Sequence, residues 1–209
     1  MPSRNTVKEY VTGEYYHIYN RGVEKRIIFI DNTDHVVFLG LIKKYLTGVD
    51  DHKSHRHKFE SLVGQVELVA FCLMPNHYHL LFRQLADDGI TKLMRRVMTG
   101  YVMYFNNKYG RVGTLFQGRY KASHINADAY LHHISRYIHL NPSNYQLYPY
   151  SSLPYYLGTK QLPSWLNPRP VLELFKDAAD YEQFLLDYTD TKQELTVLKW
   201  QLASDPEDT

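Results

Sequence analysis

The chain has 209 residues and a formal net charge of +2, and 44% of its residues are hydrophobic, an ordinary fraction for a globular protein. Cys72 is the one cysteine, which excludes an internal disulfide and a cysteine-based zinc finger. Because no apolar run approaches the ~18 residues of a membrane span and the N-terminus lacks a signal-peptide core, we expect a soluble, cytoplasmic protein without a membrane partner.

The first sixty residues predict one strand and one helix. Residues 1–13 are polar and without a period, so we expect them to fray. An alternating, tyrosine-rich run predicts a strand over 14–20, and apolar spacing behind the capping candidates at 31–33 predicts a helix over 31–46. The polar segment 47–60 is predicted to be a solvated loop, although it contains His52, His55 and His57.

The centre of the chain predicts two paired strands, over 63–74 and 77–84, which are separated only by Pro75-Asn76. Successive side chains of a strand point to opposite faces, so His77 and His79 are predicted to share one face while Tyr78 packs on the other. Two imidazoles at this spacing can supply two of the ligands of one metal ion. A lone pair of histidines is also compatible with a purely structural role.

The second half predicts a long amphipathic helix over 88–109, a fourth strand over 119–125 and a third helix that Pro142 ends. Asn126 or Asp128 is predicted to cap that helix. The order β-α-β-β-α-β-α predicts an α+β fold of the ferredoxin-like kind, an antiparallel sheet with helices packed on it.

The third helix contains Tyr137 and Asn141, one turn apart, so the spacing predicts that a hydroxyl and an amide lie on one helix face. An amide in an apolar stripe needs a partner, since a buried unpaired one costs on the order of 1–3 kcal/mol. Taken alone, Tyr137 is better explained by packing in the core, and asparagine before proline is a common helix stop.

Charge is unevenly distributed along the chain. Residues 92–121 contain seven Lys and Arg and no Asp or Glu, whereas residues 173–209 contain ten acidic residues and three lysines. A basic stretch with interleaved tyrosines favours binding to a nucleic-acid backbone with stacking of unpaired bases, and a solvated helix face is the alternative. The tyrosines are Tyr101, Tyr104, Tyr109 and Tyr120.

Five segments, in this order, resemble a known family. They are Tyr16-His17-Ile18-Tyr19-Asn20-Arg21-Gly22, Met74-Pro75-Asn76-His77-Tyr78-His79, Gly113-Thr114-Leu115-Phe116-Gln117-Gly118-Arg119-Tyr120-Lys121, Arg136-Tyr137-Ile138-His139-Leu140-Asn141-Pro142 and Tyr150-Ser151-Ser152. The chain from about residue 15 to about residue 174 is similar to the HUH single-tyrosine transposases, specifically the REP-associated tyrosine transposases.

This resemblance implies an enzyme that cleaves and joins single-stranded DNA beside a hairpin or repeat, through a covalent 5′-phosphotyrosine intermediate. It implies that Tyr137 is the nucleophile and that His77, His79 and Asn141 bind a divalent metal, Mg²⁺ or Mn²⁺. Better-studied relatives have glutamine where this chain has Asn141. We expect DNA contacts from Arg21, Lys92, Arg95, Arg96, Arg119 and Lys121.

The resemblance also suggests how the chain is divided. Residues 14–142 are predicted to form the transposase domain, residues 143–203 a mainly helical extension wrapped on it, and residues 204–209 a disordered acidic tail. A monomer and a homodimer are both open. Two other functions also remain open at this stage: a non-catalytic nucleic-acid-binding module and a metal phosphohydrolase of another type.

Overall fold

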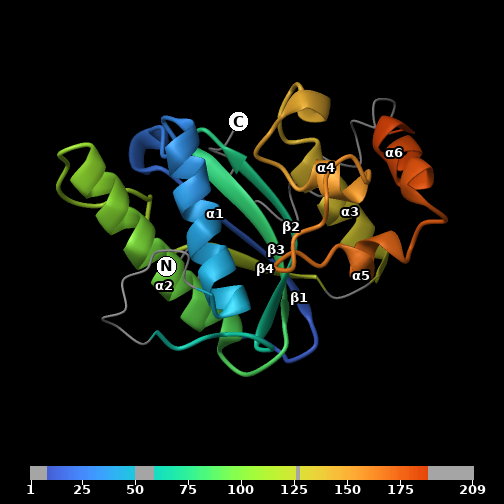
Figure 1. Ribbon diagram of the computed structural model, residues 1–209, viewed down its shortest axis with the longest axis horizontal. Coiled ribbons are helices and arrows are strands. Elements are labelled where there is room, and N and C mark those ends of the chain that lie inside the picture. Colours follow the sequence, from blue (N-terminus) through green and yellow to red (C-terminus); the bar gives the residue numbers. More distant parts are fainter. Residues whose placement is uncertain (1–8, 50–58, 126–127, 188–209) are drawn as a thin grey trace, which may run out of the picture.

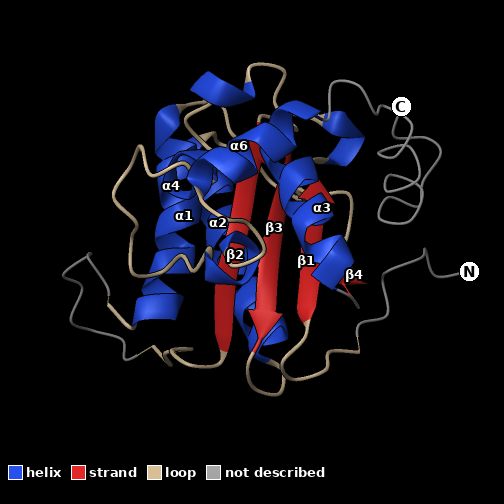
Figure 2. Cartoon of the chain, turned by 90° about the vertical axis from the view of Figure 1, so that its right-hand side faces the viewer, coloured by secondary structure: helices blue, strands red, loops and turns tan. Residues whose placement is uncertain are grey.

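The computed structural model describes residues 9–49, 59–125 and 128–187. These residues form a four-stranded sheet with helices on both faces (Figures 1 and 2). In chain order the elements are β1 (Tyr15–Arg21), the 3₁₀ helix η1 (Val23–Lys25), α1 (Asn32–Thr47), β2 (Val66–Met74), β3 (His77–Gln84), α2 (Gly89–Lys108), β4 (Lys121–Ile125), α3 (Asp128–His139), the 3₁₀ helix η2 (Tyr145–Leu147), α4 (Leu153–Tyr156), α5 (Arg169–Leu172) and α6 (Ala178–Leu186).

The sheet has the order β2-β3-β1-β4, and every neighbouring pair is antiparallel. The two central strands, β1 and β3, are joined by seven register pairs, from Tyr15 opposite Arg83 to Arg21 opposite His77. This topology confirms the predicted α+β, ferredoxin-like fold. It also places the β2–β3 turn at Pro75-Asn76, as predicted.

Strand alternation divides the core into two clusters. Tyr78, Leu80 and Phe82 point to the face that α1 and α2 cover. Leu81 points to the other face and packs with residues of α3, α4 and α6. Figure 1 shows α1 and α2 on one side of the sheet and α3, α4, α5 and α6 on the other.

Several predicted boundaries were wrong by one to three residues. The second and fourth strands begin at Val66 and Lys121, after the starts predicted at 63 and 119. Asp31 caps α1 by accepting a hydrogen bond from the Asp34 backbone, and Gly48 ends it in the left-handed conformation at φ 71°. The first strand extends to Arg21, because Arg21 still pairs with His77 of β3.

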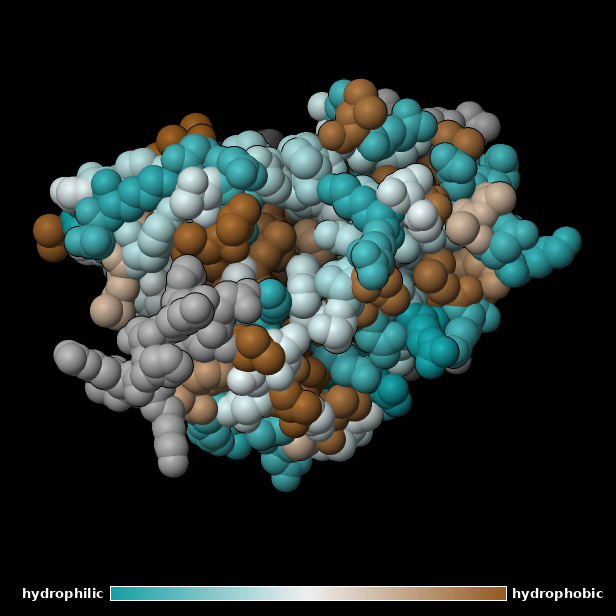
Figure 3. Space-filling view, in the orientation of Figure 1, coloured by the Kyte–Doolittle hydropathy of each residue, from teal (hydrophilic) through white to brown (hydrophobic). Residues whose placement is uncertain are grey.

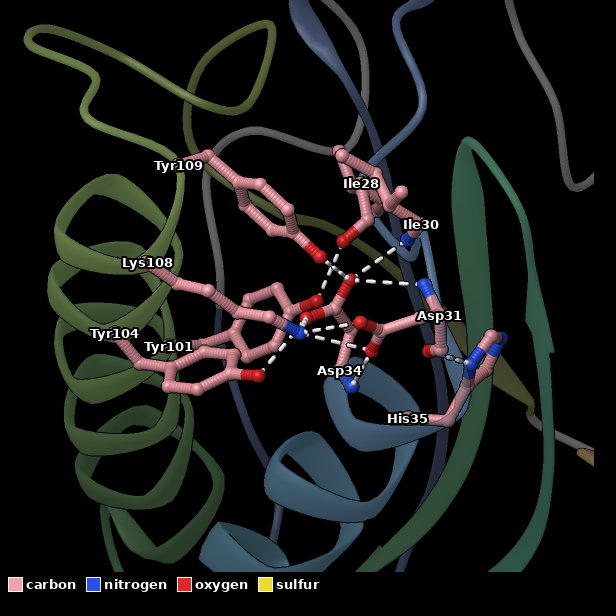
Figure 4. Close-up of polar contacts among 9 residues, drawn as sticks. All are labelled: Ile28, Ile30, Asp31, Asp34, His35, Tyr101, Tyr104, Lys108 and Tyr109. Carbon is pink, nitrogen blue, oxygen red and sulfur yellow. Dashed lines mark hydrogen bonds and ion pairs between the residues drawn. The ribbon is translucent and has the colours of Figure 1, made fainter.

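A polar cluster joins the start of α1 to the end of α2, and it overturns part of the predicted DNA surface (Figure 4). The fully buried Asp34 carboxylate accepts hydrogen bonds from the Tyr104 and Tyr109 hydroxyls and from Lys108 Nζ, which also pairs with Asp31. These tyrosines therefore hold two helices together, and Lys108 is already neutralised.

The other two tyrosines of the basic stretch also make internal contacts. The buried Tyr101 donates to the Ile28 carbonyl, and Tyr120 accepts a hydrogen bond from Tyr10. Tyr101 is fully buried, so the prediction that it offers a stacking surface was wrong, whereas stacking by Tyr104, Tyr109 and Tyr120 remains a prediction.

The segment after Pro142 packs along the outer edge of β2. Tyr150 and Ser152 exchange backbone hydrogen bonds with Leu73 and Phe71 of that edge strand, and Asn167 donates to Leu68. Backbone N–H and C=O groups of this segment thus pair with those of β2, which would be unpaired at a free sheet edge. The division into residues 14–142 and 143–203 remains a prediction.

Buried hydrogen bonds connect the same segment to α3. His139 Nδ1 lies 2.6 Å from the Tyr181 hydroxyl on α6, and His139 Nε2 lies 2.7 Å from Ser152 Oγ. Tyr181 in turn donates to Ser135 on α3. Burial lowers the pKa of His139 to about 3, so its ring is neutral and contacts both partners without a charge.

Part of the predicted N-terminal lead is anchored. Gly13 donates to the Gln84 carbonyl, and Val11 donates to the Tyr16 hydroxyl, so residues 11–13 contact the sheet. Residues 1–8, the loop histidines His52, His55 and His57, Asn126, and the tail at 204–209 lie outside the described residues.

Hydrophobic side chains reach the surface in several separate patches on the face shown in Figure 3, among larger hydrophilic areas. Within the described residues, no helix combines the length and the apolar character that crossing a membrane requires.

Candidate active site

The candidate site lies at the end of β3 that follows the β2–β3 turn. His77 and His79 project from the same face, with ring centroids 5.1 Å apart and planes at 83°. Their cross-strand neighbours are Arg21 and Tyr19 on β1. This is the face on which α3 packs, so the helix carrying Tyr137 covers the histidines.

Asn76 orients the ring of His77. The Asn76 amide nitrogen donates to the Lys25 carbonyl at 3.2 Å, which turns the Asn76 oxygen toward His77 Nδ1 at 2.6 Å. His77 Nδ1 therefore donates, and when the ring is neutral it presents a lone pair at Nε2. That Nε2 lies 3.0 Å from the side-chain oxygen of Asn141.

His79 has a comparable neighbour on β1. Its Nδ1 lies 2.9 Å from Nε2 of His17, and both rings are almost fully buried. Burial, reinforced by the neighbouring rings of His17 and His77, holds the pKa of His79 well below its ordinary value. Burial also lowers the pKa of His17 to about 3. Both imidazoles are therefore neutral near pH 7, the state in which histidine binds metals.

Tyr137 lies on the last turns of α3, and its ring contacts His79 edge to face with centroids 5.2 Å apart. Its ring is 6.0 Å from that of His17 and is half-buried. Asn141 was predicted to lie on the helix with Tyr137, but α3 ends at His139. Asn141 occupies the turn before Pro142, and this turn brings its oxygen to His77.

The donor set fits a divalent cation. Asn141 Oδ1 and His77 Nε2 are both lone-pair donors in the orientation described above, and two such atoms facing each other at 3.0 Å are satisfied by a cation between them. Neighbouring ligands of an octahedral ion bound at 2.0–2.1 Å are about 3 Å apart. The described residues contain no group of three His, Cys, Asp or Glu side chains placed to bind a metal, so a site here would need a ligand of another type, such as the Asn141 amide oxygen.

The predicted DNA-contacting cations fall into two groups. Arg21 ends β1 opposite His77, and Lys121 starts β4 opposite Tyr19, which is itself opposite His79. Arg119 is exposed two residues before β4. The first group thus lies beside the histidines.

The second group lies elsewhere. Lys92, Arg95 and Arg96 are on α2, which covers the opposite face of the sheet. Arg96 forms an ion pair with Glu60 and lies 5.4 Å from the ring of Tyr45. The structure does not bring these three cations together with Tyr137.

Two site residues, His17 and Asn76, have contacts that the sequence did not assign to the site. Strand alternation alone puts His17 on the same face of β1 as Tyr19 and Arg21. Only the register of β1 against β3 shows that this face is the one that carries His79.

Comparison with known proteins gives the family. The sequence profile described as "Transposase IS200 like" matches residues 33–141, just over half of the chain. This chain belongs to the IS200-like transposase family. The matched region of the transposase contains His77, His79, Tyr137 and Asn141, and it begins after β1 and His17.

One solved structure shares the fold of this transposase. A REP-associated tyrosine transposase bound to a REP hairpin is 18% identical, with a TM-score of 0.55 over 77% of this chain and 89% of that chain. This match shows a shared fold, in agreement with the group that the motifs indicated. A second structure, described as a transposase of Deinococcus radiodurans R1, is 16% identical, with a TM-score of 0.40 over 64% of this chain and 94% of that chain. Comparison with curated proteins finds no match.

Proposed function

We propose that this transposase is a metal-dependent endonuclease and strand-transferase for single-stranded DNA, and that Tyr137 is its nucleophile. One observation carries the proposal: a single chain places the phenol of Tyr137 against His79 and places Asn141 against His77. Residues from β3, from α3 and from the turn after α3 therefore meet on one surface of one chain.

In the proposed reaction, the Tyr137 oxygen forms a bond to the phosphorus of a DNA phosphodiester as the phenolic proton leaves. The bond from phosphorus to the 3′-oxygen breaks, and that oxygen takes up a proton to give a free 3′-hydroxyl. The product is a 5′-phosphotyrosine, which divides one hard step into two. A 3′-hydroxyl can reverse the step and join strands without a nucleotide cofactor.

His77, His79 and Asn141 are the residues that would hold the metal. A bound divalent ion supplies Lewis-acid polarisation of the scissile phosphate. Neutral imidazole and amide oxygen ligands suit Mg²⁺ or Mn²⁺ better than a thiolate-seeking metal. His79 additionally packs against the Tyr137 ring, so the same residue positions the nucleophile.

The proposed substrate is a DNA hairpin with a single-stranded flank. The relative of similar fold is described as bound to a REP hairpin. Arg21, Lys121 and Arg119 lie near the histidines and offer positive charge to the phosphates of the flank. A module that stacks bases on an open sheet is less favoured, because both clusters of the core pack helices on the described sheet.

Tyr137→Phe tests the proposal. The variant removes one oxygen, so it should retain DNA binding, lose cleavage and lose the covalent adduct of protein and labelled hairpin on a denaturing gel. Tyr130→Phe is a matched control on the exposed first half of α3 and should cleave normally. Chelation should stop the wild-type enzyme, and added Mn²⁺ should restore it. Cleavage by Tyr137→Phe would contradict the assigned nucleophile.

A further inference from the structure

His17 lies next to the site but has no part in the function proposed so far. It is on β1, 1% exposed, and its Nε2 is 2.9 Å from Nδ1 of His79. Tyr19 stacks on the His17 ring with centroids 4.9 Å apart, and Tyr137 contacts it edge-on at 6.0 Å. Its ring therefore has little freedom to turn.

The two histidines of β3 are held in a similar way. Nδ1 of His77 faces the oxygen of Asn76, and Nδ1 of His79 faces Nε2 of His17. In each ring the nitrogen that remains for a ligand is Nε2. Histidine ligands of metals usually donate their other N–H to a fixed acceptor, which sets the tautomer and the ring orientation.

We propose that His17 is a positioning residue that accepts the Nδ1–H of His79 and so fixes Nε2 of His79 as the ligand nitrogen. This inference rests on the proposed metal-dependent function. It adds a residue of β1, which precedes the matched region at 33–141, to the site groups on β3, on α3 and in the turn after α3.

Proton placement makes the proposal specific. A neutral imidazole has one N–H, so when His79 Nδ1 donates to His17 Nε2, the proton of His17 is on its Nδ1. That atom is buried and has no hydrogen-bond partner in the described structure. In the opposite arrangement His17 Nε2 donates, and the proton of His79 is then on Nε2, where it blocks coordination. Both arrangements contain the same number of protons.

The competing account is that His17 is only a core side chain. An unpartnered buried N–H costs on the order of 1–3 kcal/mol, which an apolar residue of similar size would avoid. On that account His17→Leu should not weaken metal binding. The two accounts therefore predict opposite results for one substitution.

Mn²⁺ titration by calorimetry tests the proposal on the full chain. Three variants are compared with wild type: His17→Leu removes the acceptor, His17→Gln keeps an oxygen near the Nε2 position, and His124→Gln changes an exposed histidine on β4. We expect His17→Leu to bind Mn²⁺ roughly 10- to 100-fold more weakly, with His17→Gln close to wild type and His124→Gln unchanged. Thermal unfolding of each variant shows whether it is folded.

A second measurement reads the tautomer directly. In ¹⁵N-detected NMR spectra with saturating Mg²⁺, His79 should carry its proton on Nδ1 and His17 should carry its proton on Nδ1. Equal Mn²⁺ affinity of wild type and His17→Leu, or a His17 proton on Nε2 in the loaded protein, would overturn the inference and leave the role of Tyr137 intact. Absence of Mn²⁺ binding by the wild type would overturn both this inference and the proposed metal dependence.

Discussion

At the scale of single residues, the site depends on short side chains held by fixed partners. Asn141 is the least expected member, because asparagine has a shorter side chain than the glutamine that the family resemblance led us to expect. The turn that follows the end of α3 at His139 moves the backbone of Asn141 toward β3, and its oxygen reaches His77 at 3.0 Å. A shorter side chain therefore suffices here.

Asn141→Ala should lower Mn²⁺ affinity by roughly 10-fold or more, because one ligand oxygen is lost. Asn141→Gln should retain most of the affinity, since it supplies the same oxygen on a longer side chain. Calorimetric titration measures both variants. Wild-type affinity in Asn141→Ala would remove Asn141 from the ligand set and leave a two-histidine site.

At the scale of elements, the contact between α1 and α2 supports the site from the opposite face of the sheet. Tyr101 on α2 donates to the carbonyl of Ile28, and the Ile28 and Phe29 backbone nitrogens donate to the Pro75 carbonyl. Pro75 and Asn76 form the turn that precedes His77. The packing of α2 therefore helps to hold the Pro75-Asn76 turn in place, and Asn76 in this turn orients the proposed ligand His77.

Asp34 is the centre of that contact. Burial raises the pKa of its carboxyl, but hydrogen bonds from Lys108, Tyr109, the Ile30 backbone and Tyr104 outweigh burial, so the pKa is lowered. A carboxyl with a depressed folded pKa stabilises the protein above its unfolded pKa of about 3.9, and this stabilisation is lost as the pH falls through the folded value.

Asp34→Asn should therefore lower the free energy of unfolding at pH 7 by about 1.5–3 kcal/mol, the usual contribution of a hydrogen bond to a charged group. The difference from wild type should shrink as the pH falls below about 4. Urea unfolding across this pH range measures it, with the exposed Asp87→Asn as the control. A difference that is the same at low and neutral pH would contradict the role of the Asp34 charge.

At the scale of the whole molecule, the folded chain redistributes the charge of the basic stretch 92–121. Lys108 pairs with Asp31 and Asp34, and Arg96 pairs with Glu60. Lys92 and Arg95 lie on the face of the molecule opposite α3, whereas Lys121 lies beside the histidines. The cations of residues 92–121 are therefore close in the sequence but do not form one surface of the folded protein.

Arg21→Ala and Lys121→Ala should each weaken binding of a hairpin with a single-stranded flank by about tenfold, the loss of one charged hydrogen bond. Each should also reduce the slope of log affinity against log salt by about 1. Lys92→Ala and Arg95→Ala are the matched cation controls and should change affinity less. Fluorescence anisotropy at several salt concentrations measures all four, and a larger effect from the α2 variants would place the DNA on the other face.

Features that depend on neighbours along the chain could be predicted from the sequence. The period of two in β3 determined that His77 and His79 share a face, the capping candidates at 31–33 determined the start of α1, and the order of elements determined the ferredoxin-like topology. These features follow from local backbone geometry and from apolar periodicity.

Only the tertiary structure decided which distant residues meet. The register of β1 against β3 placed His17 on His79, the turn after α3 placed Asn141 on His77, and the packing of α2 against α1 paired Lys108 with Asp34. Each outcome depends on a contact between residues more than sixty positions apart. Local propensity carries no information about such contacts, because strand register and helix packing are set by the whole core.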